Sequence, residues 1–511
     1  MRRLGERYLW VDSLCIIQDN EVDVRFQVDS MDSIYANALL VLVAAAGHDA
    51  DAGLPGVMRG SRIQRQHIEN VGQLHPANML GNKRELITRS VWNSRAWTYQ
   101  EGILASRLLT FTKDQLFFEC TYGCSHREEL YTSRRYTVPA SSTGDFSYHP
   151  LLREDVNFDI YARIVSEYTG RQMSRPSDAI RALSGVLQLL EYAYHGRKAW
   201  EGLPSIFWDA ALLWRPAGPT KRRLSPLTGK PEFPSWTWAG WEGRIHYPDL
   251  LNFCVTNHPC VDWDPQKTPN DIEIIHSSPP VSKLSQRQFD PDTLSIYYTR
   301  KGDDPGLWYS LPILEHGFSP GSKSLDDHQL LLEAPMASFN LTGEHHVGMR
   351  PLFLRCTEER HTLCPLAVFS EEGYVAGTVF VDADIAQTIE SGAYEFLALS
   401  RTTLYRNDED PAWDDETNTF LLNEADRKMP HAANDTFSEE DLGYHERTRY
   451  FDYTRYSPCK YWPLYNVLLI KRDTSNASFR RDRLPVYERI GIGKIHSDAF
   501  NGAERKILAL A

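Results

Sequence analysis

Two side chains in the segment 94–106 have the types and the spacing for chemistry on a bound molecule. Glu101 follows Trp97 by four residues, and this spacing places both on one face of a helix, one turn apart. A carboxylate suits reactions in which positive charge develops, because a nearby negative charge stabilises that state. The alternative is a structural role, in which Glu101 complements the helix dipole or pairs with Arg95 or Arg107.

A second group of polar residues lies in and after an apolar segment near the N-terminus. Asp12 interrupts the apolar run at residues 8–17, where an unpaired carboxylate would be costly to bury. We therefore expect Asp12 to lie at the exit of a strand or to pair with a cation, for which Arg95 is the candidate. Asp12 could instead shape a ligand-binding edge. Gln18 and Asp19 follow in a polar loop, where they could contact a ribose or have no ligand at all.

The cysteine and tryptophan residues favour structural roles over chemical ones. Cys15 lies in the apolar run and is expected to be an inert core residue. Cys120, Cys124 and His126 are close in sequence, but a fourth ligand and the common paired spacing are missing, so no metal site is predicted. The tryptophans of the segment 235–241 recur at strand spacing and are expected in a core.

Length and composition limit the classes of protein that the chain can belong to. Its 511 residues predict two or three packed units. The net charge of −13 argues against a broad basic footprint for nucleic acid. No run of about 18 apolar residues predicts a membrane span, and no secretory signal is visible. Eight cysteines without a dense pattern favour a reducing compartment, so a cytoplasmic location is predicted.

The first 130 residues alternate strand and helix patterns. This alternation predicts an α/β layer with parallel strands. The expected elements are a buried strand at 8–17, a helix at 24–38, a buried strand at 39–45, a helix at 94–106 and a hairpin at 108–120.

The rest of the chain divides into a linker, a helical segment and a β-rich region. We expect domain boundaries at residues 1–124, 125–150, 151–230 and 231–511. Apolar periodicity predicts helices at 158–168 and 180–190. The acidic stretch 405–427 reads as an exposed loop. Expected strands lie at 235–241, 374–381, 394–399, 467–470 and 487–495.

Two long motifs resemble the fungal heterokaryon incompatibility (HET) domain. The segment 9–19, LWVDSLCIIQD, resembles the central signature of that family, and the segment 94–101, SRAWTYQE, resembles its second signature. Further matches lie between and after them, at Met31, Ile34-Tyr35, Ala38, Gly53-Leu54 and Phe118-Glu119-Cys120. The family's upstream "LSY.WG" strand and following helix have no counterpart here, so we expect a shortened relative or a start codon placed too late.

The resemblance implies a fold and a candidate activity for the N-terminal module. HET domains are held to be distant relatives of TIR domains, which have a flavodoxin-like α/β topology and some of which cleave NAD at the nicotinamide–ribose bond. The resemblance implies Glu101 as the catalytic carboxylate and NAD as the substrate, with no cofactor. The candidate ligand-binding residues are Asp12, Gln18, Arg95 and Trp97.

The resemblance also implies a biological role in non-self recognition after fungal cell fusion, where incompatible partners trigger cell death. The implied partners are other HET-domain or incompatibility proteins, and a homo-oligomer could bring two modules together. A non-enzymatic scaffold that only binds partners is the alternative, and an inactive shortened family member is a third possibility. Whether the chain is an enzyme stays open at this point.

Overall fold

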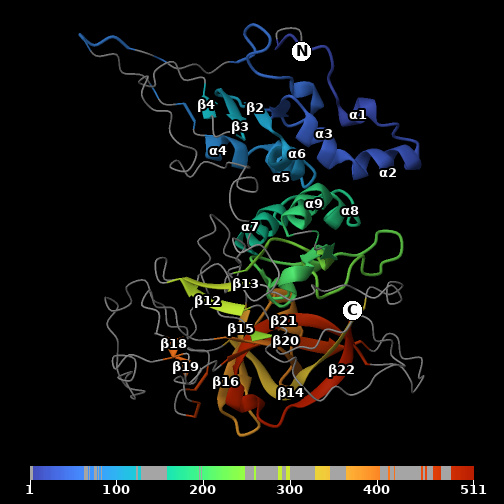
Figure 1. Cartoon of the computed structure of the whole chain (residues 1–511), viewed down its shortest axis with the longest axis vertical. Helices are drawn as coiled ribbons and strands as arrows, with labels where there is room; N and C mark the ends of the chain where they lie inside the picture. The colour runs from blue at the N-terminus through green and yellow to red at the C-terminus, as the bar shows by residue number, and fades with distance from the viewer. Residues whose placement is uncertain are drawn as a thin grey trace. The chain divides into compact units, whose positions relative to one another are not determined.

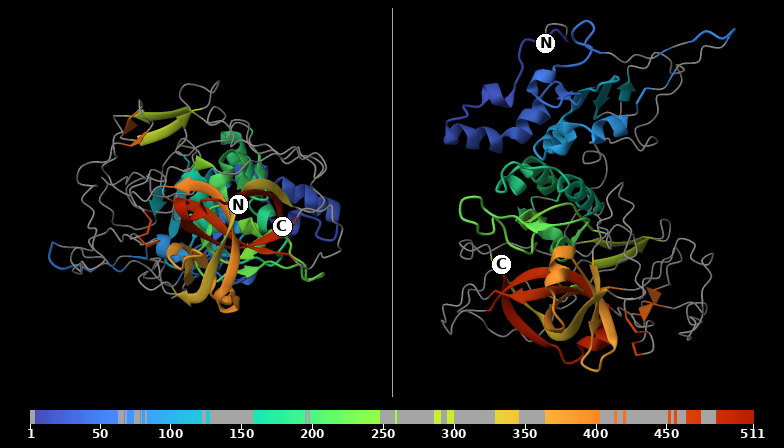
Figure 2. Two further views of the ribbon diagram at one scale, coloured as in Figure 1. Left: turned by 90° about the horizontal axis from the view of Figure 1, so that it is seen from below. Right: turned by 180° about the vertical axis from the view of Figure 1, so that it is seen from behind.

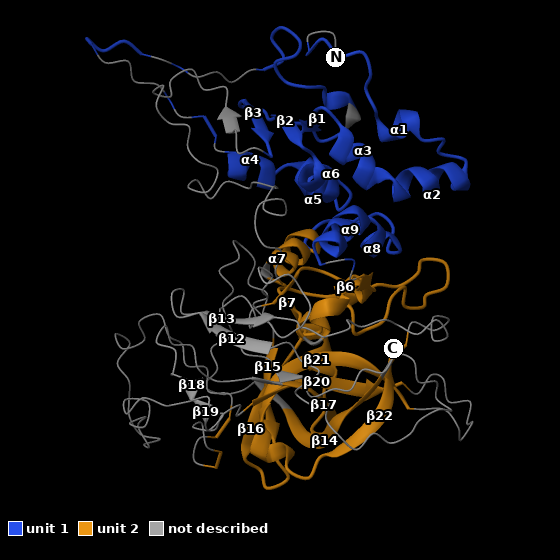
Figure 3. Cartoon of the chain, viewed as in Figure 1, with its two compact units in different colours: residues 1–156, 170–196 blue, residues 157–169, 197–511 orange. Residues whose placement is uncertain are grey.

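A computed structural model describes the chain in two compact units, which are coloured separately in Figure 3. The first unit comprises residues 1–156 and 170–196, and the second comprises residues 157–169 and 197–511. Among the helices that are described, none is long and apolar enough to cross a membrane. The described residues are 4–62, 67, 69–73, 78, 80–81, 83–121, 125–127, 158–194, 196, 198–247, 258–259, 286–290, 295–299, 329–345, 364–402, 413–414, 419–420, 451–452, 455–456, 464–473 and 485–511.

A four-stranded sheet forms the β part of the first unit (Figure 1). Its strands follow the order of the chain: β1 (Val41–Ala44), β2 (Arg107–Phe111), β3 (Leu116–Cys120) and β4 (Ser125–Arg127). The pair β1–β2 is parallel, whereas β2–β3 and β3–β4 are antiparallel. The predicted strand at 39–45 and the predicted hairpin at 108–120 are therefore confirmed. A layer of parallel strands was expected, but among the described residues of this sheet only β1 and β2 are parallel.

The helices of the first unit are shorter than the sequence pattern predicts. The expected helix at 24–38 is two helices, α2 (Glu21–Asp29) and α3 (Met31–Asn37), separated at Ser30. The side chain of Asn20 caps α2 by accepting hydrogen bonds from the backbone N–H groups of Val22 and Asp23. The remaining helices are η2 (Ala50–Ala52), α4 (Lys83–Thr88), α5 (Val91–Ser94), α6 (Thr98–Leu104), α8 (Asp178–Arg181) and α9 (Ser184–Ala193).

The predicted strand at residues 8–17 is wrong. This segment contains the one-turn helix α1 (Asp12–Cys15) and is mostly exposed, with Tyr8 and Leu14 each 82% accessible. An apolar run becomes a buried strand only when a neighbouring strand and a covering layer are present. In the described part of the sheet β1 pairs only with β2, and no strand lies beside residues 8–17.

Three helices of the first unit pack closely around one glycine. Gly185 on α9 is buried, and a Cβ atom added there would lie 2.7 Å from the Cβ of Asp32 on α3 and 2.9 Å from a methyl of Leu104 on α6. Any side chain at this position would push the helices apart. Helix α9 is therefore part of the core of the N-terminal module, although it follows α6 by about 80 residues.

Tryptophans and tyrosines form the core beside α7 (Phe158–Tyr168) in the second unit. The hydroxyl of Tyr161 accepts a hydrogen bond from the indole of Trp238 (3.0 Å) and donates one to the carbonyl oxygen of Gly202 (2.9 Å). Trp236 and Trp238 are fully buried and Trp241 nearly so, which confirms the core prediction. The predicted strand at 235–241 is wrong, because residues 238–240 form a 3-10 turn, η5 (Trp238–Gly240).

The second unit also contains a closed ring of six strands, visible in Figures 1 and 2. Each strand pairs with the next in the order β14, β15, β16, β21, β20, β17, and β17 pairs again with β14. All these pairs are antiparallel. The β-rich C-terminal region predicted from sequence thus contains a six-stranded barrel with two added strands, β22 beside β14 and the short β11 (His258–Pro259) beside β17. Its bounds are β14 (Leu330–His345), β15 (Cys364–Phe369), β16 (Val375–Val381), β17 (Gly392–Thr402), β20 (Leu464–Arg472), β21 (Val486–His496) and the added β22 (Glu504–Leu510).

Shorter elements complete the second unit. They are β5 (Ala199–Trp200), β6 (Leu203–Pro204), η4 (Ser205–Phe207), α10 (Trp208–Ala211), β7 (Arg215–Pro216), β8 (Lys221–Arg222), β9 (Trp241–Glu242), β10 (Ile245–His246), β11 (His258–Pro259), β12 (Gln286–Asp290), β13 (Ser295–Thr299), α11 (Ala383–Thr388), β18 (Trp413–Asp414), β19 (Thr419–Phe420) and η8 (Ser497–Phe500). Most of the predicted acidic loop at 405–427 lies outside the described residues; the part that is described contains β18 and β19.

A buried arginine connects the barrel to the tryptophan-rich core of the same unit. The guanidinium of Arg489 on β21 lies 3.8 Å from the ring centre of Trp214. It donates hydrogen bonds to the carbonyl oxygens of Leu212 (2.7 Å) and Trp214. Burial lowers the pKa of Arg489 to about 9, because the charged form loses hydration there.

Substitution of Gly493 tests the close packing of two barrel strands. A Cβ at Gly493 would overlap the backbone carbonyl oxygen of Thr378 on β16, whereas a Cβ at Gly392 on β17 would meet nothing within 4 Å. We expect Gly493→Ala to lower the free energy of unfolding by about 1–3 kcal/mol, and Gly392→Ala to change it by about 0.5 kcal/mol or less. Urea unfolding followed by tryptophan fluorescence measures both, and equal effects would contradict the packing argument.

Candidate functional site

Glu101 is the centre of a small polar cluster in the first unit. Its Oε2 accepts a hydrogen bond from the indole Nε1–H of Trp92 (3.3 Å), and its carboxylate is also hydrogen-bonded to the side chain of Tyr35. The charges of Arg95 and Asp12 act on the same carboxylate. The side chain as a whole is half-buried, but protein encloses the carboxylate. Side chains from α3, α5 and α6 thus meet at one carboxylate, and the charge of Asp12 on α1 acts on it.

Burial is the main influence on the acidity of this cluster. It raises the pKa of Glu101 above its ordinary value of 4.5, because the carboxylate loses hydration. The hydrogen bond from Trp92 and the charge of Arg95 partly offset this rise, whereas Asp12 adds to it. Burial, followed by the negative charge of Glu101, raises the pKa of Tyr35 well above its usual range. Tyr35 therefore remains a neutral hydroxyl at every physiological pH.

Local hydrogen bonds around the α5–α6 turn place Trp92 next to Glu101. Ser90 begins α5 as its N-cap, with its hydroxyl accepting from the backbone N–H of Asn93 (3.1 Å). The hydroxyl of Thr98 donates to the carbonyl oxygens of Trp92 and Arg95 at the start of α6. These contacts satisfy carbonyl groups at the end of α5 and fix the turn. The expected single helix at 94–106 is therefore a short helix, a turn and a second helix.

Trp97 and Glu101 have different partners, although their spacing is that of one helical turn. Trp97 occupies the N-cap position of α6, and its indole Nε1–H donates to Oδ2 of Asp178 on α8 (3.3 Å). The neighbouring backbone forms a parallel bridge between Arg95 and Gln172. The candidate ligand-binding residue Trp97 therefore helps to hold residues 172–178 against the N-terminal module. The indole beside Glu101 is that of Trp92.

Asp12 and Arg95 lie near Glu101, but they do not form the predicted ion pair. The Asp12 side chain is exposed, and its Oδ1 accepts a hydrogen bond from the backbone N–H of Ser13 (2.7 Å). The Arg95 side chain is also exposed, and the described residues contain no ion pair between the two. An exposed carboxylate in the first turn of a helix needs no cation to offset a burial cost. Both charges remain available next to Glu101.

The remaining sequence candidates have local roles. The side-chain amide of Gln18 donates to the carbonyl oxygens of Asp12 (3.2 Å) and Ile16 (3.1 Å), which closes the loop after α1. Asp19 is exposed. The prediction that Cys15 is a core residue is wrong, because this cysteine is exposed. The burial of Cys15 was inferred from the strand predicted at residues 8–17, so the two predictions are wrong for the same reason.

Two members of the cluster, Tyr35 and Trp92, were not among the sequence candidates. Tyr35 belongs to the Ile34-Tyr35 match, which gave a usable signal of its importance. Trp92 precedes the second motif and gave none. Among the described residues no group of three or more metal-binding side chains is present, and Cys124 of the Cys120–His126 group lies outside them.

Comparison with protein families identifies the module that contains this cluster. Residues 1–101 match the family model of the heterokaryon incompatibility protein (HET). The chain carries a HET domain. The match covers Tyr35, Trp92 and Arg95 and reaches Glu101 itself, so the resemblance is confirmed and supports a role related to heterokaryon incompatibility in fungi. Comparisons with curated proteins and with solved structures gave no match.

The pH dependence of stability tests the burial of Glu101. The folded-state pKa is raised, so this residue contributes stability below pH 4.5 and loses that contribution as pH rises through the folded-state pKa. Glu101→Gln keeps an acceptor for Trp92 and carries no charge to bury. We expect the melting temperature of the variant, relative to wild type, to increase between pH 4.5 and pH 8. A constant difference across this range would show that the carboxylate is hydrated.

Proposed function

We propose that this chain acts in fungal non-self recognition and triggers cell death by cleaving NAD in a TIR-like HET module. The observation that carries the proposal is the enclosed carboxylate of Glu101, hydrogen-bonded to Tyr35 and Trp92 within the segment that matches the HET family. An enclosed carboxylate acts on charge more strongly than an exposed one, because water screens it less.

The proposed reaction breaks the bond between C1′ of the ribose and the ring nitrogen of nicotinamide. The bonding electrons leave with nicotinamide, which becomes neutral, and positive charge develops on the ribose as an oxocarbenium-like state. The carboxylate of Glu101 stabilises that charge. Water then attacks C1′ and releases a proton, so the products are ADP-ribose, nicotinamide and one proton. Trp92 and Tyr35 hold the carboxylate in one orientation through their hydrogen bonds.

Loss of the carboxylate is the direct test of this activity. We expect Glu101→Gln to lower the rate of nicotinamide release from NAD by about a hundredfold or more. Glu21→Gln, an exposed acid at the start of α2, is the matched control and should keep the wild-type rate. Purified full-length protein at high concentration is incubated with NAD and the products are separated by chromatography. Equal turnover by the two variants, or none by wild type, would rule out the enzymatic mechanism.

The pH dependence of that activity follows from the pKa of Glu101. The ionised form is the active one, and burial raises the pKa above 4.5. The rate should therefore rise with pH and reach its plateau at a higher pH than an exposed glutamate would give. A rate that is flat from pH 4.5 to pH 8 would contradict this role of Glu101.

A scaffold without enzymatic activity is the second candidate function. Several large apolar side chains on and around α1 and α2 are exposed, and this favours it, because exposed apolar surface is typical of interaction sites. They include Tyr8, Leu14, Ile17, Val22 and Phe26. In this alternative the module binds another HET-domain protein, or a second copy of itself, through this surface.

Expression in a fungal host separates the two candidate functions. If the chain acts only as a scaffold, toxicity survives Glu101→Gln and is lost in the double variant Leu14→Ser/Phe26→Ser, whose side chains are 82% and 67% exposed. If NAD cleavage is required, Glu101→Gln abolishes toxicity. Comparable protein levels on an immunoblot serve as the control for both variants.

A further inference from the structure

Strand β14 in the second unit has a gap in its pairing. One of its edges pairs with β17 over residues 336–341. The opposite edge pairs with β22 as far as Met336 and with β15 from Asn340 onward. Among the described residues, no strand pairs with residues 337–339 on that edge. Because N–H and C=O groups of a strand alternate between its two sides, at least one residue there presents both groups to the gap.

A cavity of about 820 Å³ lies at this gap. Its wall includes residues 336–339 of β14, the turn after β15 at Ser370, and the start of β22 at Glu504. The strands β15 and β22 both reach β14 at the gap, and the chain departs from the sheet at Ser370 and before Glu504. The unpaired backbone of β14 is therefore reached from solvent through a concave surface.

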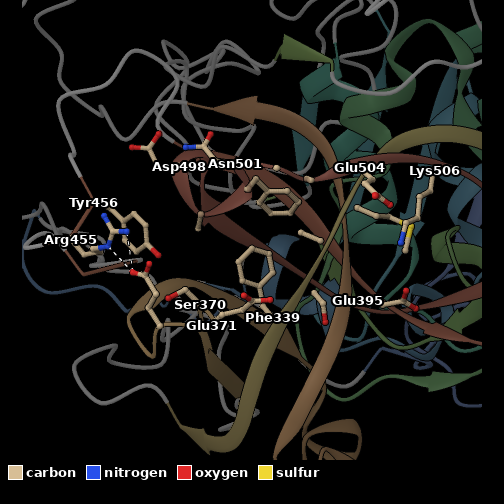
Figure 4. A pocket seen from close by; sticks show the side chains of 18 residues that line it. Phe339, Ser370, Glu371, Glu395, Arg455, Tyr456, Asp498, Asn501, Glu504 and Lys506 are labelled. Carbon is tan, nitrogen blue, oxygen red and sulfur yellow. Dashed lines mark hydrogen bonds and ion pairs between the residues drawn. The ribbon is translucent and has the colours of Figure 1, made fainter. Parts of the chain in front are cut away.

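Acidic side chains dominate the charge of this cavity (Figure 4). Five carboxylates and two cations line it. Arg455 is paired with Glu372, with Nη2 3.0 Å from Oε2, at one end of the cavity. Of the other four carboxylates, Asp498 has its Oδ2 3.8 Å from Nδ1 of His496, whereas neither Glu371 nor Glu504 has an ion-pair partner among the described residues. Such a surface attracts cations and repels anions.

The floor of the cavity is aromatic. Phe339 and Phe500 contact each other with ring centres 5.2 Å apart and are both buried, and Tyr456 is buried at the end beside Arg455. The side chains of Ser338, Glu371 and Glu504 are exposed around this floor. The cavity thus combines an unpaired strand edge, an apolar floor and an acidic rim.

We propose that this cavity binds a short extended peptide segment with basic side chains, whose backbone pairs with residues 337–339 of β14. Strand addition gives affinity through main-chain hydrogen bonds and specificity through alternate side chains. One face of such a segment would place apolar side chains over Phe339 and Phe500. The other face would place lysine or arginine side chains next to Glu371 and Glu504. The gap spans three residues, so the paired part of the ligand is about three residues long.

Synthetic peptides test the backbone pairing with the unmodified full-length protein. The probe is a fluorescein-labelled peptide of sequence Arg-Val-Arg-Val-Arg, compared with Glu-Val-Glu-Val-Glu and with the basic peptide N-methylated at residues two to five, which removes N–H donors from both edges of the strand. Fluorescence anisotropy should detect the basic peptide, no binding of the acidic one, and binding of the methylated peptide weakened by about tenfold or more, because methylation removes the N–H donors. Equal binding of methylated and unmethylated peptides, or no binding of the basic one, overturns the proposal.

Charge removal tests the acidic rim. The double variant Glu371→Gln/Glu504→Gln should weaken binding of the basic peptide by about fivefold or more, which is the effect of losing two partly exposed ion pairs. The matched control, Glu390→Gln/Glu232→Gln, removes the same charge from carboxylates that do not line the cavity and should bind like wild type. Equal weakening by both double variants means that net charge alone attracts the peptide, which overturns the assignment of this site.

Discussion

Enclosure of the Glu101 carboxylate is the constraint on which the N-terminal module depends. A buried carboxylate must be hydrogen-bonded, and here the donors come from Tyr35 on α3 and Trp92 on α5. Those two helices are therefore fixed relative to α6, which carries Glu101. The raised pKa of Glu101 follows from the loss of hydration in this arrangement. A shift of this kind is common where function requires a carboxylate, although structural clusters can also carry it.

The sequence pattern predicted strands correctly where a neighbouring strand is present in the fold. The prediction failed where no neighbouring strand is present in the described part of the chain. The segments 374–381 and 487–495 were predicted as strands from their aromatic and β-branched residues, and both form barrel strands, β16 and β21. The run at 8–17 has an equally strong apolar pattern, yet most of it is exposed. The pattern records which residues favour burial, whereas the strand forms only beside another strand. The presence of a neighbouring strand cannot be read from the sequence of the segment itself.

The candidate site was only partly predictable for a related reason. The sequence singled out Glu101 and placed Trp97 beside it by helical spacing. In the structure, Trp97 is hydrogen-bonded to Asp178 and Trp92 is hydrogen-bonded to Glu101, because the helix begins at Thr98 and a turn precedes it. Spacing arguments hold inside one helix, and they fail at its first residue. The predicted Asp12–Arg95 ion pair is absent from the described residues for the same reason as the predicted strand. Asp12 was expected to need a cation because that strand would have buried it.

The position of α9 determines where the chain can be cut to produce a folded N-terminal fragment. The family match ends at residue 101, but Gly185 lies within van der Waals distance of α3 and α6, and Trp97 is bonded to Asp178. A fragment cut after residue 124 would lose these neighbours and expose the helix surface that they cover. An expression fragment should therefore retain residues 170–196, and a recognised sequence family can be shorter than the folding unit that contains it.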